Sequence, residues 1–578
     1  MWVKILLLFF VFSFLFKTDH SFDQDLGRHL KLGEIIWQSK SVPQTNLFSY
    51  TNSNFPFINT HWLFEVFVYL VSKIAGLQAL LLIKIIIFLL SVYLTLKSIP
   101  NSNRALLLPV GFIMFHVLRE RTEFRPEIFS FLFTALTLFV LNKYSALTQT
   151  SSDLPVQSCL SVDRQAGRGT FVVNTRLIFL LPVIQLIWVN THIYFFVGLI
   201  LQAIFLIHAI YQYLFIHPKG GHIKLLSFIL LLSVIASLIN PNGLTGLLYP
   251  LNVTQNYGYT IVENQTIFFL ENIGFRDPNF LFVKLSIGII CLGIVITFLK
   301  RKLEIKNVLL AGFGVTLSLL NIRSIPYLVF LLLPTTLQNL SRIKSGAATK
   351  TLAIIFGLIL LFESLIYLNG DYYRYKDMDN SVSFKLVENG KKALDFVINN
   401  NLTGPIYNNF DIGSYIIYRG YPKYLIFVDG RPEAYPKEFF QDVYIPGQQD
   451  PQKFQELDQK IQFKTIIFSH TDQTPWGKTF LTSIVKNNNW KTVYLDDFII
   501  ILVKNDFSAL QSIELSKLNP SSYSFDSYLS YLRLSLFLLQ TQNQDSAGKF
   551  AEKGLAIFPQ SPLGNALFGV TAQNSIFW

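Results

Sequence analysis

The first polar segment of the chain carries acidic and histidine side chains at spacings suited to proton transfer. Asp23 and Asp25 stand two residues apart, and His29 follows Asp25 by about one helical turn, so that both share one helix face. A carboxylate there can act as general base on an acceptor, or help to bind a divalent cation such as Mg²⁺ or Mn²⁺. The alternative is that Asp25 caps a helix and Asp23 is solvated. We assign His29, His61 and Glu65 of the same loop to substrate binding.

A second polar segment, RERTEFRPE at positions 119–127, places arginines next to an apolar run. Guanidinium groups match phosphate oxygens bidentately, so we predict that Arg125 binds a lipid-linked phosphate. Pro126 starts the next apolar run and fixes the position of Arg125. Arg323, in a tight turn between two later runs, is a second candidate for the same ligand. In the alternative reading, the arginines are neutralised in surface pairs by Glu120, Glu123 and Glu127.

A third polar turn, in the segment WVNTHIYF, contributes Asn190 and His192 as candidate substrate-binding residues. A satisfied polar hairpin is the alternative for this turn. These separate hairpins send their polar groups to the same face, where a single cavity could collect them. We therefore expect one composite site that is assembled from segments far apart in the sequence.

The composition shows which kind of protein must position these groups. Of 578 residues, 51% are hydrophobic and only 15% are charged, against roughly 25% charged in ordinary soluble chains. Two cysteines, Cys159 and Cys291, exclude a secreted disulfide scaffold. The net charge of +12 would suggest nucleic acid in a soluble chain, but in a membrane protein it marks cytoplasmic loops, so we expect no nucleic-acid partner. The chain is predicted to be a polytopic α-helical membrane protein.

Hydropathy predicts about eleven membrane-spanning helices within residues 1–370. They lie near 3–16, 77–96, 105–118, 127–146, 176–190, 193–215, 224–240, 281–299, 307–321, 324–340 and 350–369. We expect the first run to be a retained anchor, because no small-x-small cleavage site follows it before Lys17. The loop 17–76 contains an amphipathic helix that starts at Asp25, and we expect this helix to lie flat on the membrane surface.

The basic residues predict the orientation in the plasma membrane. A cytoplasmic N-terminus puts most loop lysines and arginines inside, which satisfies the positive-inside rule. Among them are Lys97, Lys143, Lys300, Arg301 and Lys302. The loops 17–76 and 241–280 and everything after residue 370 are then extracytoplasmic.

After residue 370 the composition becomes that of a water-soluble tail. Short β-rich runs at 424–428, 465–468, 492–495 and 498–503 predict a small α/β domain over 371–505. Within it, VDGRPEAYP contains a turn signal at Asp429-Gly430. Residues 506–578 are predicted to be helical, and Ala547–Pro562 has the residue spacing of a tetratricopeptide helix pair.

Several segments together resemble a family of bacterial multispanning proteins related to the C-type (GT-C) glycosyltransferases. They are FDQDLGRHLKLGEIIW, VPQTNLFSYTNSNFPFINTHWLFEVFVYLV, FRPEIFSFLF, LIWVNTHIYFFVGL, LINPNGLTGLLYPL, IRSIPYLVFLLLP and NNFDIGSYIIYRGYPKYLIFVDGRPEAYP. Their order and topology match as a set. The chain departs from the commoner pattern at DLGRHL, where a pair of tryptophans often precedes the histidine, and at Thr191-His192-Ile193, where His-Gly is usual.

The resemblance implies a transferase that takes a sugar from a polyprenyl-phosphate carrier and passes it to a glycan, lipid or protein acceptor on the outer face. The acidic residues that serve this family as base or metal contact map onto Asp23 and Asp25. An O-antigen-type polymerase or ligase is one alternative, although the large outer loop of those enzymes generally lies between late spans. A non-enzymatic envelope scaffold or a transporter is the other. A transporter should carry charged or broken spans near the midplane, and we find Lys84 and little else.

Overall fold

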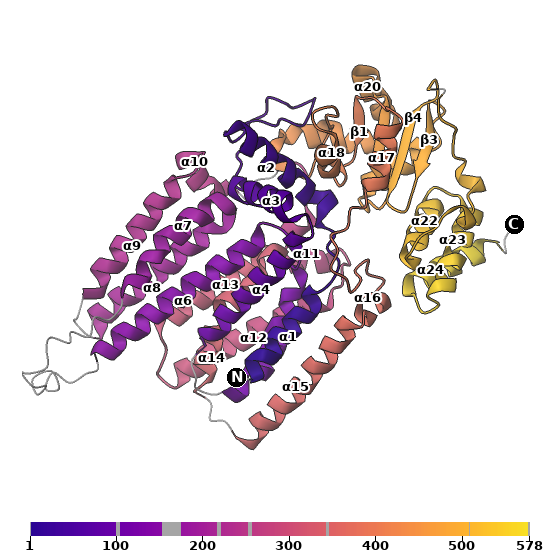
Figure 1. Ribbon diagram of the computed structural model, residues 1–578. Coiled ribbons are helices and arrows are strands. Elements are labelled where there is room, and N and C mark those ends of the chain that lie inside the picture. The colour runs from indigo at the N-terminus through magenta and orange to yellow at the C-terminus, as the bar shows by residue number, and fades with distance from the viewer. Residues whose placement is uncertain are drawn as a thin grey trace, which may run out of the picture.

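Long apolar helices form a bundle that carries a mixed α/β domain at one end (Figure 1). The computed structural model describes residues 2–99, 104–152, 175–216, 221–252, 257–342, 346–507 and 509–575. The helices of the bundle are α1 (Trp2–Leu15), α4 (Ala79–Lys97), α5 (Leu107–His116), α6 (Glu127–Ser152), α7 (Leu180–Thr191), α8 (Phe196–Phe215), α9 (Gly221–Leu238), α12 (Pro278–Leu299), α13 (Ile305–Leu320), α14 (Tyr327–Leu340) and α15 (Ala347–Leu368). Each predicted span coincides with one of them.

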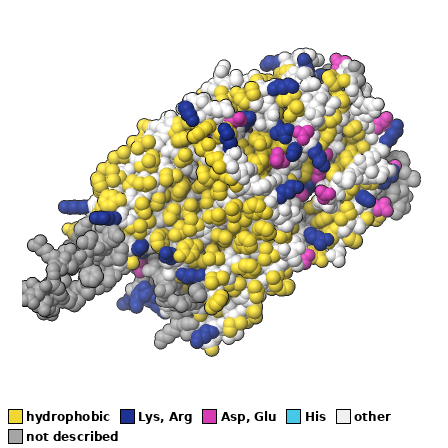
Figure 2. All heavy atoms as spheres, in the orientation of Figure 1, with side chains coloured by type: hydrophobic (Ala, Val, Ile, Leu, Met, Phe, Trp, Pro, Cys, Tyr) yellow, Lys and Arg dark blue, Asp and Glu magenta, His cyan; other side chains and the backbone are white. Residues whose placement is uncertain are grey.

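Five of the described helices are long and apolar enough to cross a membrane. A sixth span results if α9 and the segment Gly243–Asn252, bent by 114°, are taken together. The number of eleven spans also rests on shorter apolar helices and stays a prediction. Hydrophobic side chains cover the middle of the bundle, whereas charged side chains gather toward its ends and over the α/β domain (Figure 2). This distribution is the one expected of helices in contact with lipid.

Some helices of the bundle carry apolar side chains on every face, either because they lie in its interior or because they lie at its lipid-facing surface. Helix α14 lies in the interior, where Leu328 to Leu333 are all fully buried. Helix α15 lies on the outside and exposes Leu358 and Phe362 by more than half of their surface. Apolar surface of this extent is stable only against lipid or another protein. Helix α1 packs between α4 and α15, with Phe10 and Val11 fully buried.

The predicted amphipathic helix of the first loop is present but begins later than expected. A single π-helical turn covers Phe22–Leu26, and α2 then runs over Gly27–Ser39. The side chain of Asp25 makes no capping hydrogen bond to α2, whose N-cap is Leu26. Helix α3 (Trp62–Ala75) crosses α2 so closely that a Cβ on Gly33 would lie 1.9 Å from the carbonyl oxygen of Glu65. The loop 241–280 adds α10 (Gly243–Leu248) and α11 (Ile267–Asn272).

The α/β domain is built on a four-stranded mixed sheet in the order β1-β2-β4-β3. Its strands are β1 (Ile406–Asn408), β2 (Thr465–Ser469), β3 (Trp490–Leu495) and β4 (Ile499–Lys504), of which only β1 and β2 are paired in parallel. Its helices are α17 (Lys391–Asn399), α18 (Gly413–Gly420), α19 (Ile445–Gln449), α20 (Pro451–Ile461) and α21 (Pro475–Ile484), and the short α16 (Asp371–Tyr375) links it to α15.

The prediction of a strand at 424–428 is wrong, because Ile426 only forms an isolated bridge with Ser49 of the first loop. Three helices follow the sheet: α22 (Tyr528–Gln540), α23 (Gln544–Ile557) and α24 (Pro562–Ser575). Helices α22 and α23 form a tightly packed pair, and α24 packs mainly on α23. The helical tail is therefore observed, and its assignment as a tetratricopeptide unit stays a prediction.

A buried ion pair fixes the start of the first loop to the bundle. The Nζ of Lys84, on α4, lies 2.8 Å from the carboxylate of Asp19, and both side chains are at most 1% exposed. Asp19 also accepts hydrogen bonds from the Ser21 hydroxyl and from the backbone N–H of Phe124 in the arginine-rich turn. The one charged residue noted in the predicted spans thus has a structural partner.

We expect Lys84→Met to destabilise the protein strongly, since it leaves the carboxylate of Asp19 buried without a counter-ion. Removing one partner of a buried pair typically costs about 3–5 kcal/mol. The measurement is the free energy of unfolding in detergent, with Lys97→Met at the exposed end of α4 as control. An equal, small effect of both substitutions would show that the pair contributes little.

Candidate active site

A cavity of about 150 Å³ lies where loops at one end of the bundle meet the α/β domain. Six predicted site residues line it: Asp25, His29, His61, Arg125, His192 and Arg323. Gly430, Pro432 and Glu433 close it from the side of the α/β domain. Hairpins far apart in the sequence therefore send polar groups to one shared cavity, as the sequence predicts.

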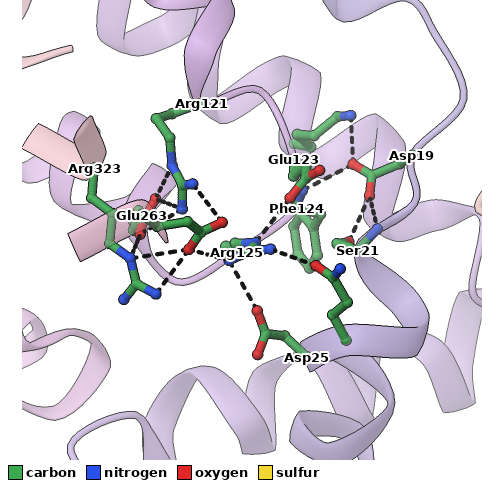
Figure 3. Close-up of polar contacts among 12 residues, drawn as sticks. Asp19, Ser21, Asp25, Arg121, Glu123, Phe124, Arg125, Glu263 and Arg323 are labelled. Carbon is green, nitrogen blue, oxygen red and sulfur yellow. Dashed lines mark hydrogen bonds and ion pairs between the residues drawn. The ribbon is translucent and has the colours of Figure 1, made fainter. Parts of the chain in front are cut away.

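One acidic residue that sequence reasoning missed contacts three arginines at or near the cavity. Glu263, from the loop 241–280, forms ion pairs with Arg121 (2.8 Å), Arg125 (2.9 Å) and Arg323 (2.8 Å) (Figure 3). Burial acts to raise the pKa of Glu263, but the guanidinium groups outweigh it and hold that pKa well below its usual range. Glu263 is therefore ionised and joins two outer turns that are about two hundred residues apart in the sequence.

The neutralisation proposed as the alternative for these arginines occurs in part. Arg121 forms a bidentate contact with Glu127, with a closest distance of 2.8 Å, and Arg125 lies 3.0 Å from Glu123. The Arg121–Glu127 pair is buried, with side chains exposed by 7% and 10%. In the second pair Arg125 is 9% exposed but Glu123 is 42% exposed, so that pair reaches the surface. Arg323 is 31% exposed, so it is the arginine most accessible to a ligand entering the cavity.

Asp25 faces the cavity and is bound by two arginines. Its carboxylate lies 3.0 Å from Arg125 and 3.1 Å from Arg28. Burial acts to raise the pKa of Asp25, but Arg125 and Arg28 outweigh it and lower that pKa below its usual value. The side chain is thus ionised at neutral pH and remains partly exposed to the cavity.

The carboxylate of Asp23, unlike that of Asp25, contacts backbone groups of the α/β domain and, among the described residues, no arginine. Its carboxylate accepts hydrogen bonds from the backbone N–H groups of Asn389 and Gly390, just before α17. Burial raises the pKa of Asp23 to about 7, although these N–H groups oppose the change. Asp23 does not line the cavity, so the two carboxylates of the DQD segment do not converge on one point.

Three histidines form a row along the cavity. The ring centroids of His29 and His61 lie 5.8 Å apart, and those of His61 and His192 lie 5.4 Å apart. Burial lowers the pKa of each; for His61 it falls to about 3, with His29 contributing. The imidazoles are therefore neutral at pH 7, and each offers one donor and one acceptor nitrogen. The ring of Tyr194 stacks on His192 at 5.2 Å and continues the row.

Two predicted substrate-binding residues lie behind the cavity wall instead. Glu65 is fully buried and contacts His29 Nδ1 at 3.0 Å, which fixes the orientation of that ring. Asn190 accepts a hydrogen bond from Trp62 Nε1 and donates to the carbonyl oxygens of Leu186 and Ile239. Both thus position neighbouring elements, and neither lines the cavity.

The VDGRPEAYP segment anchors the α/β domain on the first loop. Asp429 and Arg431 form a buried pair at 2.6 Å, and Arg431 also donates to Asn46 at 2.9 Å. The guanidinium lies over the rings of Phe48 and Phe57. These contacts therefore join the α/β domain to the first loop beside the cavity.

The loop that carries Glu263 is itself anchored on the α/β domain by an aromatic residue. The ring of Tyr259 stacks on Phe410 at 4.5 Å and packs against Phe440 and Trp476. Only three residues separate Tyr259 from Glu263. This contact therefore sets where the carboxylate meets the arginines.

We expect Tyr259→Ala to release this loop, because aromatic contacts of this kind contribute about 0.5–1.5 kcal/mol each. The measurement is hydrogen exchange at the amides of Asn264 and Gln265, which bond to Ile261 and Val262 within the loop. Their protection should fall in Tyr259→Ala and be retained in Tyr259→Phe, which keeps the ring. Equal protection in both variants would show that Tyr259 does not hold the loop.

A divalent cation at Asp23 and Asp25 is not supported by the arrangement of the side chains. Within the described ranges, no group of three or more histidine, cysteine or acidic side chains is placed to hold a metal. Asp25, Glu123 and Glu263 all contact Arg125, which occupies the position they share. The residues in this arrangement do not fit a metal, and no step proposed below uses one.

Comparison with known proteins reveals a likeness of fold. At the level of sequence, neither the protein-family models nor the curated proteins give a match. Among solved structures, the chain matches the archaeal oligosaccharyltransferase AglB from Archaeoglobus fulgidus, in complex with an inhibitory peptide and a dolichol-phosphate, with a TM-score of 0.52. The chain has the fold of this oligosaccharyltransferase. The identity is 10%, over 96% of this chain and 86% of AglB.

A second structure gives the same result. It is an Archaeoglobus fulgidus oligosaccharyltransferase tethered through a disulfide bond to an acceptor peptide containing the NVT sequon, with a TM-score of 0.55. Here the identity is 12%, over 86% of this chain and 72% of that one. The chain therefore shares the overall fold of these two oligosaccharyltransferases, and its relation to the GT-C glycosyltransferases stays a prediction.

Proposed function

We propose that the chain is an integral membrane glycosyltransferase that moves a sugar from a polyprenyl-phosphate-linked donor to an envelope acceptor on the extracytoplasmic face. The observation that carries the proposal is the convergence of Asp25, Arg125 and Arg323 on one cavity at the end of the apolar bundle. Such a transfer needs a carboxylate to accept the proton of the acceptor and guanidinium groups to bind the donor phosphate. The likeness in fold to oligosaccharyltransferase structures holding a dolichol-phosphate or an acceptor peptide supports a lipid-linked donor.

In this proposal Arg323 binds the donor phosphate. As the bond from the anomeric carbon to the phosphate oxygen breaks, negative charge builds on the phosphate, and a preorganised guanidinium stabilises it. In the structure, the guanidinium of Arg323 pairs with the carboxylate of Glu263. A donor phosphate therefore competes with this carboxylate for the guanidinium of Arg323. Glu263 then moves away from Arg323, while its ion pairs with Arg121 and Arg125 are retained.

Asp25 acts on the acceptor. The acceptor atom forms its bond to the anomeric carbon while its proton passes to the carboxylate of Asp25. Arg125 and Arg28 hold the pKa of Asp25 below its usual value, so the carboxylate is ionised and can accept this proton. The neutral row of His29, His61 and His192 offers hydrogen bonds to sugar hydroxyl groups.

The test is transfer in proteoliposomes that contain the purified chain and a radiolabelled lipid-linked sugar extract. Label should move from the organic-soluble lipid to an acceptor that no longer extracts into organic solvent. Liposomes with Lys453→Ala, altered on the far side of the α/β domain, serve as a matched control and should behave as the parent. A yield no higher than in liposomes without the chain would contradict the proposal.

A further inference from the structure

A second, larger hollow lies between the first-loop helices and the α/β domain. This groove of about 810 Å³ is bounded by α2 and α3 on one side and by α17 and α18 on the other. Lys31, Glu34 and Gln38 line it from a face of α2 that does not carry His29. The groove shares no lining residue with the cavity described above.

The groove carries an excess of positive charge. Four cations line it, Lys31, Lys73, Lys391 and Arg419, against the carboxylates of Glu34 and Glu388. Lys31 is paired with Glu34 at 2.7 Å, and Arg419 is paired with Asp395 at 2.6 Å. Within the described part of the chain, Lys73 and Lys391 have no carboxylate within the 4.0 Å of an ion pair. Among the described residues Glu388 has no cation within that distance either, so it offsets one of the two lysines and the groove keeps a net positive charge.

The position of the groove indicates which anion could balance the charge of Lys73 and Lys391. Leu77 lines it, two residues before α4, which is long and apolar enough to cross a membrane. The groove therefore opens at the level where the span leaves the hydrocarbon, which is where lipid phosphates lie. Ile74, next to Lys73, is 82% exposed, as expected of a side chain in contact with lipid tails.

Tyr69 and Tyr418 complete the lining from opposite walls. Tyrosine is enriched at the boundary of membrane and water, because its ring packs on apolar chains while its hydroxyl stays hydrated. Basic side chains next to tyrosines at headgroup level are the combination that recognises anionic lipids.

We propose that the groove between α2–α3 and α17–α18 binds the headgroup of an anionic membrane phospholipid through Lys73 and Lys391. Lys73 belongs to the membrane unit and Lys391 to the α/β domain. A headgroup that contacts both lysines would link the two parts. This site is independent of the proposed glycosyl transfer.

The experiment measures lipid binding to the full-length chain in a non-ionic detergent by native mass spectrometry. Phosphatidylglycerol and phosphatidylcholine are compared as probes. The parent should bind phosphatidylglycerol preferentially, and Lys73→Ala combined with Lys391→Ala should weaken that binding about 25-fold, since each lysine near a headgroup contributes about fivefold. Lys453→Ala combined with Lys460→Ala, which removes the same charge from α20, should leave it unchanged.

A second double variant, Lys73→Arg with Lys391→Arg, keeps the test decisive if the alanine variant unfolds. It retains both positive charges and should therefore retain binding of phosphatidylglycerol. Equal binding of the two lipids by the parent, or unchanged binding by the alanine variant, would overturn the proposal. If glycerol phosphate displaces phosphatidylglycerol at a concentration equal to that of the lipid, the groove would be a site for free phosphate. Tighter binding of acidic galacturonate oligomers would make it a glycan site, and either result would refute the lipid assignment.

Discussion

Asp25→Asn should lower sugar transfer by about 10²–10⁴-fold, the range expected when a general base is removed. Asparagine keeps the size of the side chain and can still accept a hydrogen bond from Arg28 or Arg125, which lie 3.1 and 3.0 Å from the carboxylate. It no longer accepts a proton. The loss should therefore appear in the rate of transfer and leave the folded protein intact. The measurement is the initial rate from a polyprenyl-phosphate-linked sugar, together with the thermal unfolding midpoint.

Asp23→Asn is the matched control for this prediction, since it changes the same residue type two positions earlier. Asp23 accepts hydrogen bonds from two backbone N–H groups, and an amide oxygen replaces the carboxylate there incompletely. We expect a loss of about 1–3 kcal/mol in the free energy of unfolding and near-parental transfer per folded molecule. Full transfer by Asp25→Asn would show that Asp25 is not the general base. A large loss of rate confined to Asp23→Asn would assign that role to Asp23.

Arg323→Lys should weaken binding of polyprenyl phosphate by about 10- to 100-fold. Lysine keeps the positive charge but loses the planar fork that binds two phosphate oxygens at once. Hydrogen bonds to charged groups contribute about 1.5–3 kcal/mol, which sets this range. Arg323 suits the test because it is more exposed than Arg125, whose contacts with Asp25, Glu123 and Glu263 would all be disturbed by substitution.

The affinity of detergent-solubilised protein for polyprenyl phosphate measures this effect directly. Arg125→Lys should also weaken binding and should in addition alter the protonation of Asp25, because Arg125 lowers the pKa of that carboxylate. Arg301→Lys, after α12 and away from the outer loops, is the control and should bind as the parent. If Arg323→Lys and Arg125→Lys both bind with parental affinity, neither arginine is the phosphate ligand.

Much of the membrane unit could be predicted from the sequence because hydrophobic run length is a direct physical signal. The convergence of Asp25, Arg125, His192 and Arg323 could also be predicted, since each follows or precedes an apolar run that ends on the same side. The strand β1 was missed because three residues carry too little periodicity to be recognised. The run 424–428 was read as a strand because buried apolar residues look alike in strands and in buried loops.

Residues that act through distant partners were not accessible to sequence reasoning. Glu263 stands in a long loop with no local pattern, and its role depends on three arginines from two other segments. Asp19 was also overlooked, although a signal existed: Lys84 lies within an apolar span, and a buried lysine requires a carboxylate partner. The separate roles of Asp23 and Asp25 follow from the packing of the α/β domain, which the sequence does not reveal.

The central claim is that the cavity binds a lipid-linked phosphate, and locating polyprenyl phosphate in its complex with the parent chain by electron cryo-microscopy tests it most directly. The account predicts a phosphate at the guanidinium of Arg323, with the carboxylate of Glu263 moved away from its present 2.8 Å contact with that arginine. A lipid bound with its phosphate outside the cavity, and with the contact between Arg323 and Glu263 intact, would contradict it.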